Sequence, residues 1–265
     1  MTNPQYYKSA IDGSGCISNA WELIKTNYWL YLGMTFVSGL ILVALSFIPI
    51  VGIVAVAPLT GGLYFAYLRA MRGEYVDFGM LFKGFEKFVP LLIIGLVQGI
   101  PSIIVQILQL FLNLASLAIP PNSNRDISFY QSGPAEFPLA GGLLVVAIIA
   151  FLILLLFSIA WTITFTFAIP IAMDQDVDAL TAIKLSARAG WSNVGGIIVL
   201  AILIGLIFLV SMIAICLLGP LWVSPLYIAS WAFAYRQVFP DLGPTVFRNE
   251  PPPPSAYQGS FGQGL

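Results

Sequence analysis

Residues 28–68, YWLYLGMTFVSGLILVALSFIPIVGIVAVAPLTGGLYFAYL, form an apolar stretch without a charged side chain. A helix crosses the hydrocarbon core of a bilayer with about 20 apolar residues, so this stretch is long enough for two crossings. FIPIVG at 47–52 supplies the break between them, because proline lacks a backbone N–H and disfavours helix in the residue before it. The stretch therefore predicts two transmembrane helices, over residues 29–47 and 51–71.

Three further apolar stretches follow. Residues 88–119, which contain Pro101, predict a third helix, and residues 139–172 predict a fourth. Both are longer than one crossing needs, so they either tilt or extend beyond the bilayer. Residues 194–238 contain GPLWVSP at 219–225 and divide into helices over 194–217 and 221–238. The expected fold class is an all-α integral membrane protein with about six transmembrane helices.

The composition of the 265-residue chain fits this class. Hydrophobic residues make up 59% and charged residues 9%, whereas soluble proteins average about 25% charged. The formal net charge of −1 argues against nucleic-acid binding, which needs a concentrated excess of Lys and Arg. The absence of histidine excludes imidazole bases and His-based zinc motifs. Cys16 and Cys216, the only cysteines, suggest no disulfide framework and are expected to be small apolar filler.

The positive-inside rule tests the topology independently, because it counts Lys and Arg in the loops. With six crossings, Arg125 alone falls on the outer side. The other ten cations fall on the opposite side: Lys8, Lys25, Arg69, Arg72, Lys83, Lys87, Lys184, Arg188, Arg236 and Arg248. We therefore expect both termini in the cytoplasm and the loop at 119–138 outside. The first 28 residues lack the apolar core of a signal peptide, so Tyr28 is expected to begin a retained helix.

The chain divides into a cytoplasmic segment (1–14), a six-helix membrane domain (15–240) and a tail (241–265). The tail ends in EPPPPSAYQGSFGQGL, which has no apolar periodicity. Its Pro, Gly and Gln content predicts disorder with an extended polyproline segment. The tail is the expected binding site for a protein partner.

Three segments that precede crossing helices have the periodicity of amphipathic helices. Such a helix lies in the membrane interface, with apolar side chains toward the acyl chains and Lys and Arg at the headgroups. The apolar sets are Ile17, Ala20, Trp21, Ile24 and Tyr28; Phe78, Leu81, Phe82, Phe85 and Phe88; and Leu180, Ile183, Ala187 and Trp191. The candidate contacts to lipid headgroups are Arg69, Lys83, Lys87, Lys184, Arg188 and Arg236.

The second and third of these segments indicate an internal repeat. They coincide under a constant shift that pairs Asp77 with Asp178 and Lys83 with Lys184. Each repeat unit would be an interfacial helix followed by membrane crossings.

Uncharged polar side chains form a stripe along the third helix and another along the fourth. Successive members are three or four residues apart: Gln98, Ser102, Gln106, Gln109 and Asn113, and Ser158, Thr162 and Thr166. The stripes have two interpretations. They hydrogen-bond the helices together, at about 0.6–2 kcal/mol per contact, or they line a polar pocket or pathway. Pro101 and Pro170 favour the second, because helix breaks free carbonyls that can line a cavity.

Every Asp and Glu lies outside the predicted crossings, so no intramembrane carboxylate is available as a proton relay or ion ligand. The densest acidic cluster, DQDVD at 174–178, matches the first three ligand positions of a calcium loop. Ala179 and Leu185 then stand where such a loop needs Gly and Glu. We expect Asp178 to cap a helix N-terminus, and we expect no catalytic residue, metal or cofactor.

Residues 58–88, PLTGGLYFAYLRAMRGEYVDFGMLFKGFEKF, and 169–191, IPIAMDQDVDALTAIKLSARAGW, resemble uncharacterised polytopic bacterial membrane proteins of the domain-of-unknown-function type. Some of these are similar to the membrane region fused to glycerophosphodiester phosphodiesterases. The resemblance covers roughly residues 15–240 and implies a six-helix architecture in the bacterial inner membrane. It implies no activity, because the phosphodiesterase's catalytic acids and histidines have no counterpart here.

Three functions stay open at this point. The leading hypothesis is a non-enzymatic multi-pass membrane protein that organises or modulates an envelope or lipid-associated process, with membrane lipids and a tail-bound protein as partners. The alternative is a transporter or channel for a small neutral or amphiphilic substrate, which uses the two polar stripes. The third is a lipid-modifying enzyme in which Asp174, Asp176 and Asp178 bind a metal and a headgroup.

Overall fold

The computed structural model describes residues 6–47, 49–117, 137–175, 177–215 and 218–240. Within them all regular secondary structure is helical: α1 (Gly13–Lys25), α2 (Tyr28–Ser46), α3 (Pro49–Met71), the 3₁₀ helix η1 (Phe78–Lys87), α4 (Phe88–Leu117), α5 (Phe137–Phe165), α6 (Ala168–Asp174), α7 (Ala179–Ser192), α8 (Val194–Ile215) and α9 (Leu218–Val238). Nearly all of the expected outer loop, the tail at 241–265, Asp176 and Cys216 lie outside the described residues.

Four described segments are long and apolar enough to cross a membrane, namely Tyr28–Leu45, Phe78–Ile107, Phe151–Asp174 and Val194–Ala214. The predicted class, an all-α protein with helices fit to cross a membrane, is confirmed in this coarse form. The count of six crossings and the internal repeat stay predictions.

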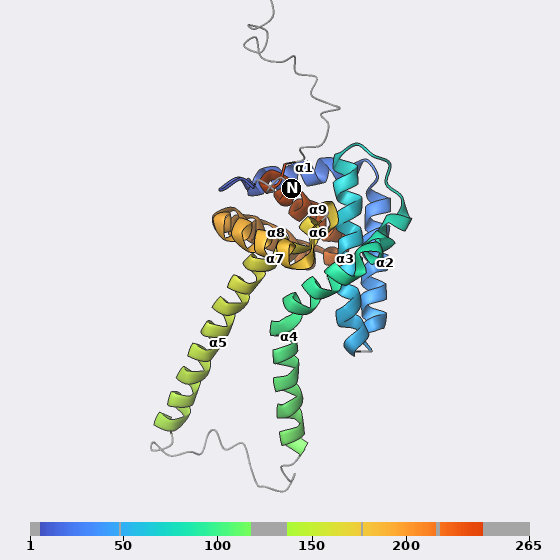
Figure 1. Cartoon of the computed structure of the whole chain (residues 1–265). Coiled ribbons are helices and arrows are strands. Elements are labelled where there is room, and N and C mark those ends of the chain that lie inside the picture. Colours follow the sequence, from blue (N-terminus) through green and yellow to red (C-terminus); the bar gives the residue numbers. More distant parts are fainter. Residues whose placement is uncertain (1–5, 48, 118–136, 176, 216–217, 241–265) are drawn as a thin grey trace, which may run out of the picture.

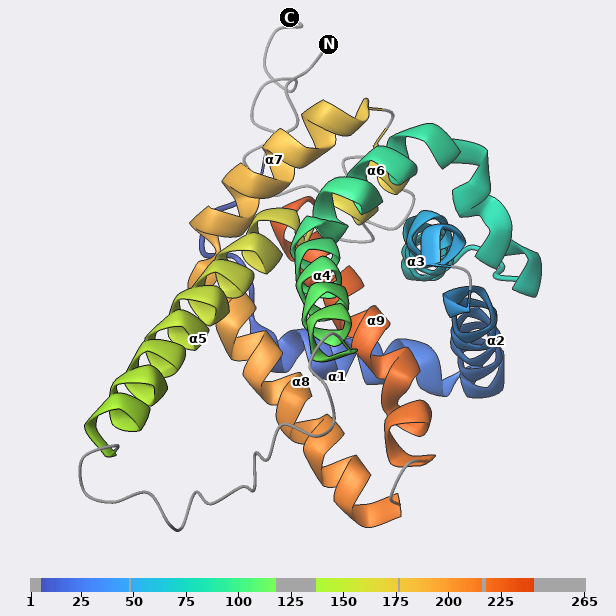
Figure 2. The ribbon, with the colours of Figure 1, turned by 90° about the horizontal axis from the view of Figure 1, so that it is seen from below.

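The helices run in two main directions. α2 and α3 stand side by side, while α4 and α5 extend from the body as two diverging legs (Figure 1). From below, α2 and α3 are seen nearly end-on, whereas α8 and α9 are seen lengthwise (Figure 2). The α8–α9 hairpin therefore runs across the α2–α3 hairpin instead of standing parallel to it.

The α2–α3 hairpin and η1 form one tightly packed unit. The rings of Tyr31 and Tyr67 stack with their centroids 4.9 Å apart. Gly62 of α3 and Gly84 of η1 bring the two backbones together, because a Cβ on either would collide with the main-chain oxygen of Leu81 or Pro58. This close approach fixes η1 against α3.

The predicted fourth helix is broken where α5 ends and α6 begins. Pro170 has no N–H to donate to the carbonyl four residues earlier, and its ring crowds that carbonyl, so the break falls at residues 166–167. The hydroxyl of Ser186 on α7 bridges the break: it accepts from Phe167 N at 3.1 Å and donates to Thr164 O at 2.8 Å. The sequence did not predict that α7 supplies these hydrogen bonds.

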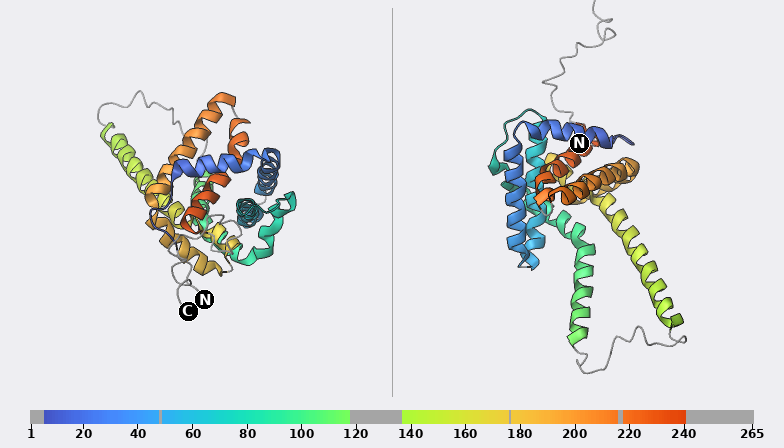
Figure 3. Two further views of the ribbon diagram at one scale, coloured as in Figure 1. Left: turned by 90° about the horizontal axis from the view of Figure 1, so that it is seen from above. Right: turned by 180° about the vertical axis from the view of Figure 1, so that it is seen from behind.

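α1 packs against α9. Near one end Asp12 N donates to Gln237 Oε1 at 2.8 Å, and near the other Tyr28 OH donates to Trp222 O at 2.6 Å. From above, α1 runs lengthwise across the body while α2 and α3 appear end-on (Figure 3). The sequence predicted α1 as interfacial and α9 as crossing, yet the two helices are in contact.

Each of the three amphipathic segments is helical and buries one face, which on α1 and α7 consists mostly of small residues. The buried positions are Gly13, Cys16, Ala20 and Ile24 on α1, Leu81 and Gly84 on η1, and Ala179, Ala182, Ser186, Ala189 and Gly190 on α7. Large apolar side chains stay outside, among them Trp21, Phe82 and Trp191. The small residues let α1 and α7 lie close to the body, while the aromatic side chains named above face outward.

Cys16 is fully buried. Burial raises the pKa of its thiol to about 12, so at neutral pH almost none of it is the reactive thiolate.

Candidate functional site

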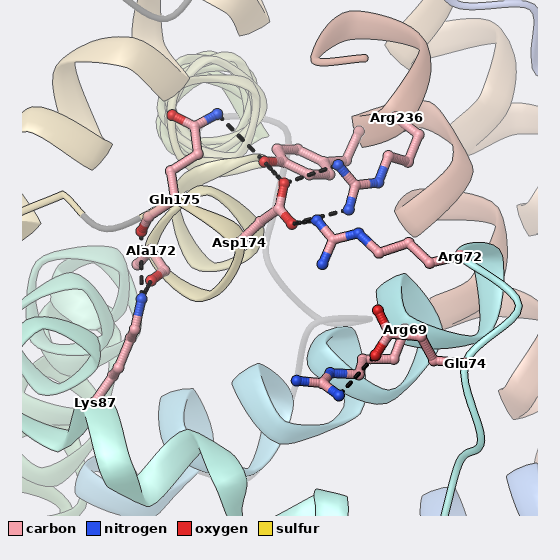
Figure 4. A network of polar contacts seen from close by, with 9 residues as sticks. Arg69, Arg72, Glu74, Lys87, Ala172, Asp174, Gln175 and Arg236 are labelled. Carbon is pink, nitrogen blue, oxygen red and sulfur yellow. Dashed lines mark hydrogen bonds and ion pairs between the residues drawn. The ribbon is translucent and has the colours of Figure 1, made fainter. Parts of the chain in front are cut away.

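A buried ion-pair network centres on Asp174, the last residue of α6. The Asp174 side chain is 8% exposed. Its Oδ1 accepts from Arg72 Nη2 at 2.7 Å and from Arg236 Nη2 at 2.8 Å. Its Oδ2 accepts from Arg236 Nη1 and from Tyr235 OH, both at 2.8 Å (Figure 4). The Arg236 contact is therefore bidentate, which is the strongest geometry available to an arginine and a carboxylate.

A third cation approaches the same helix end from η1. Lys87 Nζ donates to Ala172 O at 3.0 Å and to Gln175 O at 3.3 Å (Figure 4). Carbonyls at a helix C-terminus lack intrahelical partners and carry partial negative charge, so a cation there is stabilising. We call Arg72, Lys87, Asp174, Tyr235 and Arg236 the Asp174 cluster.

The Asp174 cluster joins four parts of the chain. Arg72 follows α3, Lys87 ends η1, Asp174 ends α6, and Tyr235 and Arg236 belong to the last turn of α9. Asp174 is 102 positions from Arg72 and 62 from Arg236. The cluster therefore holds together the cytoplasmic ends predicted for several helices.

The chemistry open to this carboxylate is limited because its oxygens already accept four hydrogen bonds. A carboxylate has about four acceptor sites, so Asp174 has little capacity left for a metal or a substrate proton. Asp178 is also engaged: it accepts from Thr181 N at 3.2 Å. Hydrogen bonds from the Thr181 side chain and backbone lower the pKa of Asp178. Among the described residues, no group of three Asp, Glu, Cys or His side chains could hold a metal.

The six candidate headgroup residues differ in their partners. Arg69 pairs with Glu74 at 2.6 Å, and Lys83 pairs with Glu86 at 2.6 Å. Lys87 and Arg236 belong to the Asp174 cluster. Lys184 and Arg188 on α7 are exposed and make no ion pair or side-chain hydrogen bond within the described part of the chain. These two are the candidates whose charges are available to a ligand.

The two polar stripes do not meet along their length. α4 and α5 diverge away from the body (Figure 1), and near the body Trp161 Nε1 donates to Gln98 O at 3.2 Å. On α5, the hydroxyls of Thr162 and Thr166 donate to carbonyls of their own helix, at Ser158 and Thr162. On α4, Ser102, Gln106, Gln109 and Asn113 are exposed. Both interpretations of the stripes, as hydrogen bonds between helices and as the lining of a polar pocket, stay predictions.

A separate pocket of about 370 Å³ lies where the end of α1 and the start of α2 face the segment between α3 and η1. Its polar lining includes Thr26, Asn27, Glu74 and Asp77. Asn27 and Asp77 occupy the N-cap positions of α2 and η1, yet neither side chain makes a capping hydrogen bond. The sequence did not predict this pocket, because its walls come from segments about 50 positions apart.

The sequence also did not predict the Asp174 cluster, and assigned Arg236 to lipid headgroups instead. The available signal was that Asp174 and Arg236 each end an apolar helix on the same predicted side of the membrane. Opposite charges at the same depth can pair, although sequence spacing does not select the partner.

Comparison with protein-family models gave no match, and comparisons with curated proteins and with solved structures gave none either.

A double-mutant cycle tests whether the cluster stabilises the fold. With Asp174→Ala, Arg236→Ala and the double variant, we expect a coupling free energy of about 2–3 kcal/mol, because both side chains are largely buried. The exposed Lys83–Glu86 pair, replaced in the same way, should give about 0.5 kcal/mol or less. Tryptophan fluorescence during unfolding in detergent measures both. Equal couplings in the two pairs would contradict a structural role for the cluster.

Proposed function

We propose that this protein is a non-enzymatic multi-pass membrane protein that organises or modulates a lipid-associated process of the cell envelope. The observation that carries the proposal is the outer surface of α7. There Lys184 and Arg188, both without an acidic partner among the described residues, stand beside Leu180 and Trp191, which are 62% and 55% exposed.

These four side chains share one face of α7. At about 100° per residue they fall within about 80° around the helix axis, and the buried residues Ala182, Ser186 and Ala189 lie on the opposite side. Apolar and aromatic side chains beside Lys and Arg are the combination that binds a membrane interface. Anionic headgroups attract each such cation by about 1 kcal/mol. α7 is therefore the proposed lipid-binding surface.

The use of the acidic side chains supports a non-enzymatic role. Asp174 is held by Arg72 and Arg236, Glu74 by Arg69 and Glu86 by Lys83. A carboxylate whose oxygens are bound by cations in the resting protein has fewer acceptor sites left for a substrate. In this proposal α7 binds membrane lipid and the tail at 241–265 binds the protein partner, so the chain brings that partner to the membrane.

We also propose that the chain crosses the bacterial inner membrane six times with both termini in the cytoplasm. The cytoplasmic ends predicted for α3, α6 and α9 meet in the Asp174 cluster, which supports a common side for them. The bacterial location rests on the family resemblance. The direction of the α8–α9 hairpin, which runs across the α2–α3 hairpin (Figure 2), bears on this count. If α9 stays at the interface with α1, the α8–α9 hairpin does not cross and the termini still share one side.

Lipid retention tests the role of α7. We expect Lys184→Gln/Arg188→Gln to weaken binding of anionic lipids by about 2 kcal/mol, or roughly 30-fold, because two headgroup contacts are lost. Native mass spectrometry of protein extracted with its own membrane measures the lipids that remain. Lys25→Gln/Lys83→Gln removes the same charge from residues paired with Glu22 and Glu86 and should retain them. Equal retention in the two variants would refute the proposal.

Cysteine labelling tests the number of crossings. In a Cys16→Ser/Cys216→Ser background, six crossings predict that Leu221→Cys at the start of α9 reacts with a membrane-impermeant maleimide only from outside intact cells. Ser18→Cys, on the exposed face of α1, should react only in inverted vesicles. Labelling of Leu221→Cys from the inside would show that the α8–α9 hairpin does not cross.

A further inference from the structure

One face of α4 packs against α3 in the first half of the helix, and the same face continues into the second half. In the first half of α4, Leu91 lies against Gly61 of α3, and Gly95 lies against Ala57. Farther along, α4 leaves α3 and extends from the body of the molecule (Figure 1).

The same face then becomes the polar stripe. At about 100° per residue, Leu91 and Gly95 share a sector of about 80° with Gln98, Ser102, Gln106 and Gln109. Pro101 lies inside α4, and Figure 1 shows the helix changing direction along its length, as a proline within a helix produces. Gln106 and Gln109 follow Pro101, in the half of α4 that extends from the body. Both are exposed, and neither makes a side-chain hydrogen bond within the described residues.

This surface does not suit lipid. The opposite face carries Ile104 and Ile107, which are 56% and 62% exposed and fit acyl chains. A primary amide has two donors and a carbonyl acceptor, and no lipid tail can bond to them. In transmembrane helices such side chains turn toward another helix. Two glutamines three residues apart on one face therefore mark a helix–helix contact that one copy of the chain leaves open.

We propose that this face of α4 binds the same face of α4 in a second copy of the chain. The stripe is uncharged, and an amide is self-complementary, because its N–H groups can donate to the carbonyl oxygen of an identical amide. Two copies in one membrane have the same orientation, so their α4 helices run parallel about a two-fold axis along the membrane normal. In such an isologous contact a residue near the axis faces its own equivalent. Gln106 and Gln109 then meet Gln106 and Gln109 of the second copy.

Oxidative cross-linking of the full chain in its native membrane tests this contact. In a Cys16→Ser/Cys216→Ser background, Gln106→Cys and Gln109→Cys should each form a disulfide-linked species with the mass of two chains. Ile104→Cys is the matched control, because it lies at the same depth on the opposite face of α4 and should stay near background. Gln106 makes no contact that the fold depends on, so its replacement leaves the chain folded.

Native mass spectrometry gives a second readout. The wild-type protein should be recovered as a dimer, and Gln106→Leu/Gln109→Leu should convert most of it to monomer, while Ile104→Leu remains dimeric. Three results would overturn the proposal: cross-linking of Ile104→Cys as strong as that of Gln106→Cys, a cross-linked product whose mass includes a different protein, or a wild-type monomer.

Discussion

The buried carboxylate of Asp174 constrains the rest of the fold. A carboxylate that is 8% exposed is costly unless cations and hydrogen-bond donors surround it, and α6 itself supplies neither. Arg236 and Tyr235 come from α9, Arg72 from the end of α3 and Lys87 from η1. Three segments that are each far from α6 in the sequence must therefore reach its end, and their positions fix the helices to which they belong.

Hydropathy predicted the helices well because each must satisfy its own backbone in an apolar environment. The expected ranges 29–47 and 51–71 correspond to α2 (Tyr28–Ser46) and α3 (Pro49–Met71). Hydropathy did not predict how they are arranged. The positive-inside rule counts Arg236 in the same way whether it binds lipid or Asp174. It also gives the same result whether the α8–α9 hairpin crosses or lies beside α1, because both alternatives leave the termini on one side. The packing of α1 against α9 depends on side chains such as Gln237 that hydropathy ignores.

The sequence already distinguishes the amphipathic segments whose cations have an acidic partner in the same helix from the one whose cations do not. Lys25 has Glu22 three residues before it, and Lys83 has Glu86 three residues after it, and both pairs form. Neither Lys184 nor Arg188 has an acid three or four residues away. Pairing within a helix thus neutralises Lys25 of α1 and Lys83 of η1, whereas Lys184 and Arg188 of α7 have no such partner. The segments share an interfacial pattern, and charge spacing supports α7 as the proposed lipid-binding surface.

Hydrogen–deuterium exchange of wild type and Asp174→Asn in detergent tests most directly whether the Asp174 cluster holds the helix ends together. If it does, the substitution will accelerate exchange together at α6, the end of α3, η1 and the last turns of α9, while the α2–α3 contact around Tyr31 and Tyr67 stays protected. Faster exchange confined to α6 would contradict this, because the other segments would then be held in place without Asp174.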